Sequence, residues 1–182
     1  MSTNSLQLNA DKTEVLIIAP DASVPSCLGS LSANVRPKSR NLGVTFDHAK
    51  LFDEHVKTVI HSCFFHLKNI SKLRSILTYS ELEMIIHAFV SSRLDYCNSL
   101  FTCLNKSSLD CLQLVQNAAA RLLSRSHKFT HITPVLASLH WLPVNFRIQF
   151  KILTITYRAL HCQAPAYLSD LVSFYCQTTM FG

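Results

Sequence analysis

Apolar positions recur at spacings of three and four residues through the middle of this chain, which is typical of amphipathic helices. A first long helix is predicted from Asp53, with these apolar positions: Phe52, Val56, Val59, Ile60, Cys63, Leu67, Ile70 and Leu77. At about 100° per residue they cluster within roughly one third of the helix circumference. Lys57, His61, Lys68 and Lys72 share a separate face. This basic stripe is either a solvated surface or a surface that lies beside a phosphate backbone.

A second helix is predicted to begin near Thr78, where two overlapping motifs fit a capping box. In such a box, a hydroxyl side chain and an acidic side chain three residues later each bond a free backbone N–H group. The two pairs are Thr78 with Glu81 and Ser80 with Glu83. The expected inward positions are Leu82, Ile85, Ile86, Phe89 and Val90.

Helical spacing continues as far as residue 174, whereas residues 177–182 show no structural pattern. A third helix is expected to begin near Ser107 or Ser108, and the alanines at 118–120 would allow a neighbouring helix to approach closely. Its end is basic, with Arg121, Arg125, His127, Lys128 and His131. Cations also stabilise a helix C-terminus through the helix dipole, so this run has a structural explanation beside a nucleic-acid one. Further helices are predicted at 132–136, about 145–161 and 166–174.

The first fifty residues read as β-rich. Val15 to Ala19 is a continuous apolar run and predicts a buried strand. Residues 28–35 are a weaker strand candidate, 36–40 a basic turn, and Leu42 to Phe46 a short strand. So few strands need helices or a larger sheet to cover them. We therefore expect an α+β fold that is mostly α, with short antiparallel N-terminal strands followed by a helical bundle and a helical extension.

Composition narrows the classes of function. Apolar residues make up 48 % of the 182 positions and charged residues 15 %, as in a folded protein. Three glycines are too few for a glycine-rich phosphate loop. The formal charge of +6 suits a polyanionic partner, although many ordinary proteins share this balance. Eleven Asp and Glu residues include no adjacent Asp pair, so no set of carboxylates for metal-assisted phosphoryl transfer is evident.

Seven cysteines without a CxxC pair predict reduced, mostly buried thiols and argue against a zinc site. Residues 1–9 are polar, so we expect no secretory signal, and no apolar run reaches the roughly 18–20 residues that span a bilayer. These features favour an intracellular protein, cytoplasmic or nuclear, without a membrane or small-molecule partner.

Seven phrases of the chain together resemble one protein family. They are LNADKTEVL, NLGVTFD, SRLDYCNSL, LQLVQNAAARLL, HITPVLASLHWLPV, RIQFKILTITYRAL and APAYLSDL. In order and spacing they are similar to the part of a non-LTR (LINE-type) retrotransposon reverse transcriptase, an RNA-directed DNA polymerase, that follows its catalytic aspartates. The resemblance is densest from Leu42 to Leu171 and extends back to Leu8.

The resemblance implies roles for particular positions. Lys12 would correspond to a palm lysine near the incoming nucleotide, and Leu42, Gly43 and Val44 to the primer grip. Residues 1–50 would then be a palm remnant with a primer-grip-like hairpin. Residues 51–128 would be thumb-like helices along an RNA/DNA template–primer duplex, and 129–182 a helical C-terminal extension with a truncated end.

The same resemblance places the metal-binding aspartates upstream of this segment. We therefore expect no cofactor here, Mg²⁺ belonging only to a full-length relative, and no polymerase activity from this chain alone. The predicted nucleic-acid contacts, besides the hairpin, are Lys57, Lys68, Lys72, Arg121, Arg125 and Lys128. The alternative is a helical protein-interaction module or a genomic remnant of a retroelement.

Overall fold

A computed structural model describes residues 9, 12–18, 32–47, 52–127 and 129–172. A β-hairpin of β1 (Lys38–Asn41) and β2 (Val44–Asp47) precedes the helices. The helical elements are α1 (Asp53–Leu73), α2 (Tyr79–Ile86), the π-helical η4 (His87–Ser91), α3 (Ser92–Asp95), the 3-10 helix η5 (Asn98–Cys103), α4 (Lys106–Ser124), α5 (Ile132–Ser138), α6 (Val144–Leu160) and α7 (Ala166–Ser169). The expected α+β, mostly α class is confirmed.

Helix α1 forms as its periodicity predicts. Its inward face buries Val56, Cys63, Leu67 and Ile70, each against the core. All four positions of the basic stripe are exposed. Asp53 and Glu54 occupy the first turn, where carboxylates stabilise the positive end of the helix dipole. The sequence therefore fixes both the start of α1 and the face that it buries.

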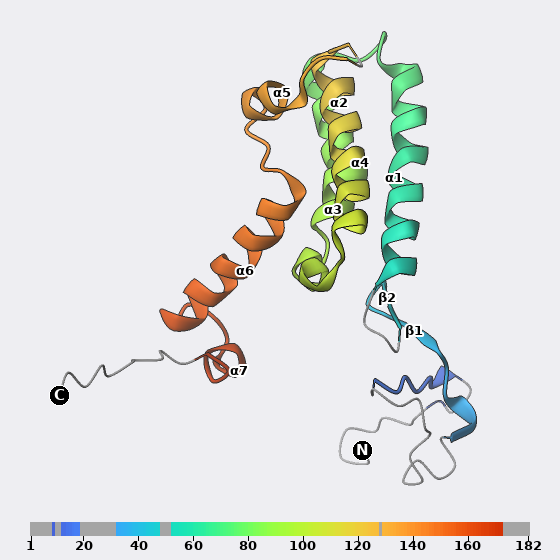
Figure 1. The fold of residues 1–182 in the computed structure, drawn as a ribbon, viewed down its shortest axis with the longest axis vertical. Coiled ribbons are helices and arrows are strands. Elements are labelled where there is room, and N and C mark those ends of the chain that lie inside the picture. Colours follow the sequence, from blue (N-terminus) through green and yellow to red (C-terminus); the bar gives the residue numbers. More distant parts are fainter. Residues whose placement is uncertain (1–8, 10–11, 19–31, 48–51, 128, 173–182) are drawn as a thin grey trace, which may run out of the picture.

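Helices α1 and α4 lie side by side, and both run upward in Figure 1 so that their C-terminal ends meet. The segment α2–η4–α3 returns in the opposite direction beside them. The core between these helices is apolar, and its α4 members are Leu112, Val115, Ala119 and Leu123. Burying an aliphatic side chain of this size stabilises a fold by about 1.5–3 kcal/mol. This core fixes the position of α1 relative to α4, and so the relative position of the side chains on their outer faces.

The π-helical turn η4 changes which side chains point inward. Leu82, Ile86 and Val90 are buried as expected, but Phe89 is 45 % exposed, so its predicted inward position is wrong. A π-helical turn holds an extra residue compared with an α-helical turn. Val90 therefore points into the core, and Phe89 points outward.

The N-terminal strands differ from the prediction. Leu42 and Gly43 are not strand residues but the two-residue turn between β1 and β2, with Asn41 paired to Val44. Residues 38–40, expected in a turn, belong to β1. The predicted buried strand from Val15 is absent over the described residues 15–18. There, Val15 makes one isolated bridge to Val35 and Ile18 is exposed. Residues 32–34 form a 3-10 turn rather than a strand.

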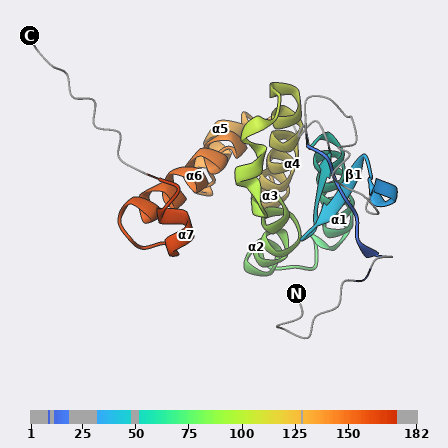
Figure 2. The same cartoon turned by 90° about the horizontal axis from the view of Figure 1, so that it is seen from below.

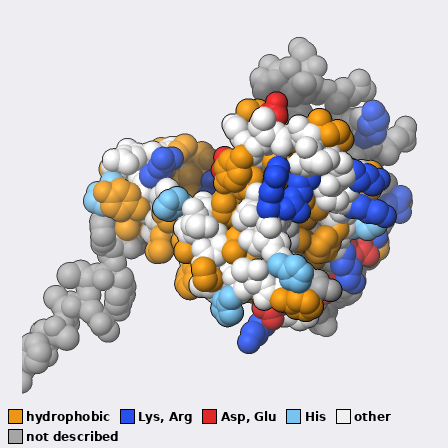
Figure 3. All heavy atoms as spheres, turned by 90° about the horizontal axis from the view of Figure 1, so that it is seen from above, with side chains coloured by type: hydrophobic (Ala, Val, Ile, Leu, Met, Phe, Trp, Pro, Cys, Tyr) orange, Lys and Arg blue, Asp and Glu red, His pale blue; other side chains and the backbone are white. Residues whose placement is uncertain are grey.

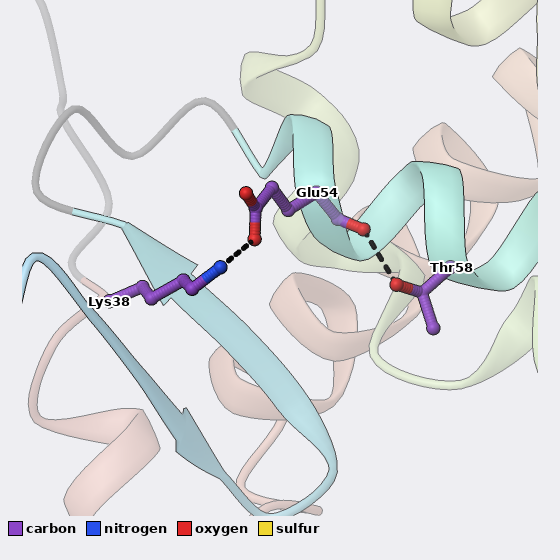
Figure 4. Close-up of polar contacts among 3 residues, drawn as sticks. All are labelled: Lys38, Glu54 and Thr58. Carbon is purple, nitrogen blue, oxygen red and sulfur yellow. Dashed lines mark hydrogen bonds and ion pairs between the residues drawn. The ribbon is translucent and has the colours of Figure 1, made fainter.

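An ion pair joins the hairpin to the start of α1. The Lys38 ammonium lies 2.7 Å from a carboxylate oxygen of Glu54, and the Thr58 hydroxyl donates a 2.8 Å hydrogen bond to the Glu54 carbonyl (Figure 4). Val44 of β2 and Phe52 both enter the main core. Seen from below, the hairpin lies at α1 on one side of the bundle, whereas α6 and α7 extend on the other side (Figure 2). The hairpin is therefore positioned by packing and by charge.

Helix α5 attaches to the bundle through α4, and α6 attaches through η5, α4 and α3. Ala120 contacts the pair Val135 and Leu136 of α5, whereas Ala118 and Ala119 pack in the main core. The Gln116 amide donates a 2.8 Å hydrogen bond to the Leu142 carbonyl, so α4 also holds the α5–α6 connection. Ile148 reaches the main core from α6. Elsewhere on α6, four side chains at helical spacing are 55–67 % exposed: Phe146, Phe150, Leu153 and Tyr157.

The cysteines are less buried than predicted. Cys63 is fully buried and Cys97 is half-buried, but Cys103, Cys111 and Cys162 are exposed. Cys27 and Cys176 lie outside the described residues. The exposed cysteines occupy outward positions of η5 and α4 and the end of α6, where the periodicity leaves no core contact. None of the helices in the described part of the chain has the length and apolar character to cross a membrane.

Candidate nucleic-acid interface

The two helix C-terminal ends bring basic side chains from α1 and α4 together. Lys68 and Arg74, with Phe64, Leu67 and Ser71, form one side of a groove of about 390 Å³. Arg121, with Ala118, Leu122 and Ser126, forms the other side. We call this surface the basic groove. Figure 3 looks onto this end of the molecule and shows Lys and Arg side chains gathered there.

Arg121 is a half-buried cation of the basic groove. One of its terminal nitrogens lies 3.5 Å from the Thr130 carbonyl oxygen, to which it donates. Its Nε is buried and has no hydrogen-bond partner within the described part of the chain. Arginine presents five N–H donors in a fixed planar arrangement that matches phosphate oxygens. An anion in the groove would therefore accept from the terminal nitrogens of Arg121, because Nε is shielded from the surface.

The structure brings together two of the predicted contacts and separates others. Lys68 and Arg121 share the basic groove. Lys72 and Arg125 are exposed near the same helix ends, and Lys57 lies nearer the start of α1. Lys128 lies outside the described residues.

Sequence reasoning missed Arg74 as a member of the basic groove. It caps α1 and continues the row of Leu67 and Ser71 toward α4. The spacing of seven from Leu67 to Arg74 could have identified it, because residues seven apart lie on one helix face.

The helix dipoles give these cations a structural role as well. Parallel α1 and α4 place two partial negative charges at the same end of the molecule. Lys72 lies in the last turn of α1, and Arg121 in the last turn of α4. Arg125 has a left-handed backbone, with φ of 54°, at the end of α4. The helix-dipole explanation considered from the sequence for the end of α4 therefore applies to Arg121, and Lys72 occupies the equivalent position in α1.

The hairpin tip forms a second part of the candidate interface. Leu42 and Gly43 have φ angles of 47° and 85°, as a two-residue hairpin turn of this kind requires. Leu42 is 82 % exposed, whereas Val44 is 2 % exposed and belongs to the core. Of the three predicted primer-grip positions, two therefore present a surface and Val44 supports them from beneath.

A cleft of about 610 Å³ lies beneath this tip, and we call it the hairpin cleft. The hairpin contributes Arg40, Gly43 and Thr45 to its lining. The helical segment contributes His55, Thr58, Val59, Ser62, Ser92, Arg93 and Tyr96. Burial lowers the pKa of His55 below its ordinary value, and the nearby Arg40 charge lowers it further. The neutral imidazole is therefore favoured there, and the two arginines carry the positive charge of the cleft.

Lys12 lies away from the basic groove. Its backbone N–H donates to the side-chain oxygen of Asn9 at 3.2 Å, so Asn9 forms a local turn before the segment. The Ser39 hydroxyl donates to the Glu14 carboxylate at 3.0 Å, which holds the segment beside β1. Figure 1 shows this segment at the opposite end of the molecule from the C-terminus of α1. Lys12 is exposed.

Across the described residues, no three His, Cys, Asp or Glu side chains are placed to share a metal ion. Comparisons with protein-family models, with curated proteins and with solved structures found no match to this chain.

Proposed function

We propose that this chain is a template–primer-binding fragment of a non-LTR retrotransposon reverse transcriptase that does not polymerise DNA by itself. The observation that carries the proposal is the convergence of Lys68, Arg74 and Arg121 on one groove between α1 and α4. The sequence resemblance supplies the family, and in this proposal α1 to α4 act as the thumb. Leu42 and Gly43 act as the tip of the primer grip, and Lys12 is what is left of the palm motif.

The basic groove binds the phosphate backbone rather than the bases. Contacts of this kind give affinity without sequence specificity and release counterions from the duplex. Three phosphate contacts correspond to a salt dependence with a slope of about −2.7 in log–log form. Affinity should then fall on the order of 40-fold between roughly 50 and 200 mM salt.

An RNA–DNA hybrid titration at these two salt concentrations tests the proposal. Lys68→Ala and Arg121→Ala should each weaken binding and reduce the magnitude of the salt slope by about 0.9. Lys106→Ala is the matched control, because Lys106 is an exposed cation at the other end of α4. Equal affinity at both salt concentrations, or an equal effect of all three variants, would contradict the proposal. Measurable primer extension by the purified chain would contradict its lack of polymerase activity.

The exposed apolar face of α6 favours a second candidate function, a helical protein-interaction module. Phe146, Phe150, Leu153 and Tyr157 repeat at spacings of four, three and four along the helix. The charged residues of α6 are all basic: Arg147, Lys151 and Arg158. This combination fits an amphipathic partner helix with acidic flanks. If an acidic amphipathic peptide bound α6 tightly and the RNA–DNA hybrid did not bind, this second function would replace the first.

A further inference from the structure

The hairpin cleft continues along α1 into a second hollow. This α1 pocket has a volume of about 470 Å³ and is lined by Lys57, Thr58, His61, Ser62 and Phe65. Thr58 and Ser62 line the hairpin cleft as well. The two hollows therefore form one surface, which runs from Tyr96 beneath the hairpin to Phe65 on the outer face of α1.

Exposed aromatic rings lie at the far end of this surface. Phe65 is 59 % exposed, and its ring centroid lies 5.5 Å from that of His66. The His66 ring in turn stacks on Phe89 at 5.0 Å, with 29° between the ring planes. Phe89 reaches this position because the π-helical turn η4 directs it out of the core. Such turns occur frequently at functional sites.

The charge of the surface is positive along its length. Arg40 and Arg93 line the hairpin cleft, and Lys57 lines the α1 pocket. None of the described residues that line either hollow is acidic. Serine and threonine hydroxyls lie between the cations, at Thr45, Thr58, Ser62 and Ser92. A basic path that ends at exposed aromatic rings is the combination with which proteins bind single-stranded nucleic acids.

We propose that single-stranded RNA or DNA binds along this surface, with phosphates at Arg40, Arg93 and Lys57 and unpaired bases stacked on Phe65 and on the His66–Phe89 pair. A single strand fits better than a duplex, because paired bases already stack on one another and do not offer their faces to a protein ring. The proposal rests on the proposed nucleic-acid-binding function but uses a different surface from the basic groove. The strand crosses the outer face of α1 from the hairpin, whereas the duplex lies at the basic groove, at the C-terminal ends of α1 and α4.

Fluorescence anisotropy with labelled oligo(U) and oligo(dT) of about 12 nucleotides tests the proposal, since these sequences do not pair with themselves. Phe65→Ala and Phe89→Ala should each weaken binding by about tenfold. Neither change should alter the affinity for an RNA–DNA hybrid. Tyr167→Ala is the matched control, because it removes an exposed ring on α7, outside both proposed surfaces. Circular dichroism verifies that the variants remain folded.

A second variant keeps the test independent of packing at α1. Phe65→Trp retains a stacking ring, so it should bind oligo(U) at least as tightly as the unmodified chain, and its fluorescence should be quenched on binding. If Phe65→Ala and Phe89→Ala bind single strands normally while the hybrid still binds, the single-strand surface is wrong and the basic groove stands. If the unmodified chain binds neither single strands nor the hybrid, both proposals are wrong.

Discussion

The hydroxyl of Tyr96 donates a hydrogen bond to the carbonyl oxygen of Leu42, a residue 54 positions earlier in the chain. The bond ties the tip of the hairpin to the end of α3. The Tyr96 ring also lies close to the other turn residue, since a Cβ atom on Gly43 would lie 3.7 Å from it. A non-glycine residue with a left-handed backbone, as at Leu42, is held only by its surroundings. Tyr96 therefore sets the position of the hairpin above its cleft.

Removing this hydroxyl should loosen the tip without unfolding the bundle. We expect Tyr96→Phe to lower the free energy of unfolding by about 1 kcal/mol, the usual contribution of one hydrogen bond. Amide hydrogen exchange should accelerate at residues 41–45 and stay unchanged in α4. Tyr167→Phe is the control, because Tyr167 is exposed on the short α7. Unchanged exchange at the tip of Tyr96→Phe would show that the hairpin is held by other contacts.

The helices of this fold could be predicted from the sequence, because their signals are local. The apolar spacing of α1 and the Thr78 motif each involve residues within one or two turns of one another. The hairpin is different. The position of Leu42 depends on Tyr96, and a local sequence pattern cannot predict a contact between residues 54 positions apart.

The features of the candidate site that the sequence did not predict also depend on more than local sequence patterns. Phe89 fits an inward position in an α-helix, and only the π-helical turn exposes it. Val15 lies in an apolar run that is typical of a strand. A strand also needs a neighbouring strand, and over the described residues Val15 forms only an isolated bridge to Val35. The basic groove needed α1 and α4 to lie parallel, whereas each helix alone showed only its own cations.

Mutations at the start of α2 can test which of the two predicted capping boxes stabilises the helix. The structure forms the capping box of Thr78 with Glu81, through a 3.4 Å bond from the Glu81 N–H and a 2.9 Å bond to the Glu81 carboxylate. Thr78→Ala should therefore lower the free energy of unfolding by about 1 kcal/mol. Ser80→Ala, in the motif that does not cap the helix, should have little effect. Urea denaturation of the two variants distinguishes them.

The capping box also predicts a dependence on pH. Hydrogen bonds from the Thr78 backbone and side chain lower the pKa of Glu81 below its ordinary value in the folded protein. This stabilisation is present above the glutamate pKa of the unfolded chain, and it is lost as the pH falls through the lower folded pKa. The difference in stability between the unmodified chain and Thr78→Ala should therefore shrink in acid. A constant difference down to full protonation would contradict the role of Glu81.

Arg147 holds α6 against α3 through a 2.8 Å ion pair with Asp95. Burial raises the pKa of Asp95 above its ordinary value, and Arg147 opposes this rise. Arg147→Ala should cost about 1 kcal/mol at neutral pH, since Asp95 is more than one third exposed and solvent screens the pair. The carboxyl pKa should rise further in the variant.

In the unmodified chain Asp95 and Glu81 have pKa shifts of opposite direction, but the deficits of both variants decrease in acid. A folded pKa above the unfolded one destabilises the fold as the pH rises through it, so the deficit of Arg147→Ala should vanish in acid, where Asp95 is protonated. Adding Asp95→Asn should remove most of the deficit at neutral pH. Lys151→Ala, which removes a more distant cation, is the control. Equal deficits at acid and neutral pH would show that Arg147 acts through packing alone.

The cysteines predict a pattern of chemical reactivity that reports on the core. Burial raises the pKa of the Cys63 thiol to about 11, and its side chain is 0 % exposed, so it should resist alkylation at mildly alkaline pH. The exposed thiols of Cys103, Cys111 and Cys162 should react readily under the same conditions. Iodoacetamide labelling followed by peptide mass spectrometry measures each site, and labelling in denaturant supplies the control in which Cys63 reacts as fast as the others. Labelling of Cys63 at the rate of Cys111 in the native chain would mean that α1 opens away from α4, and the basic groove between them would then be absent in solution.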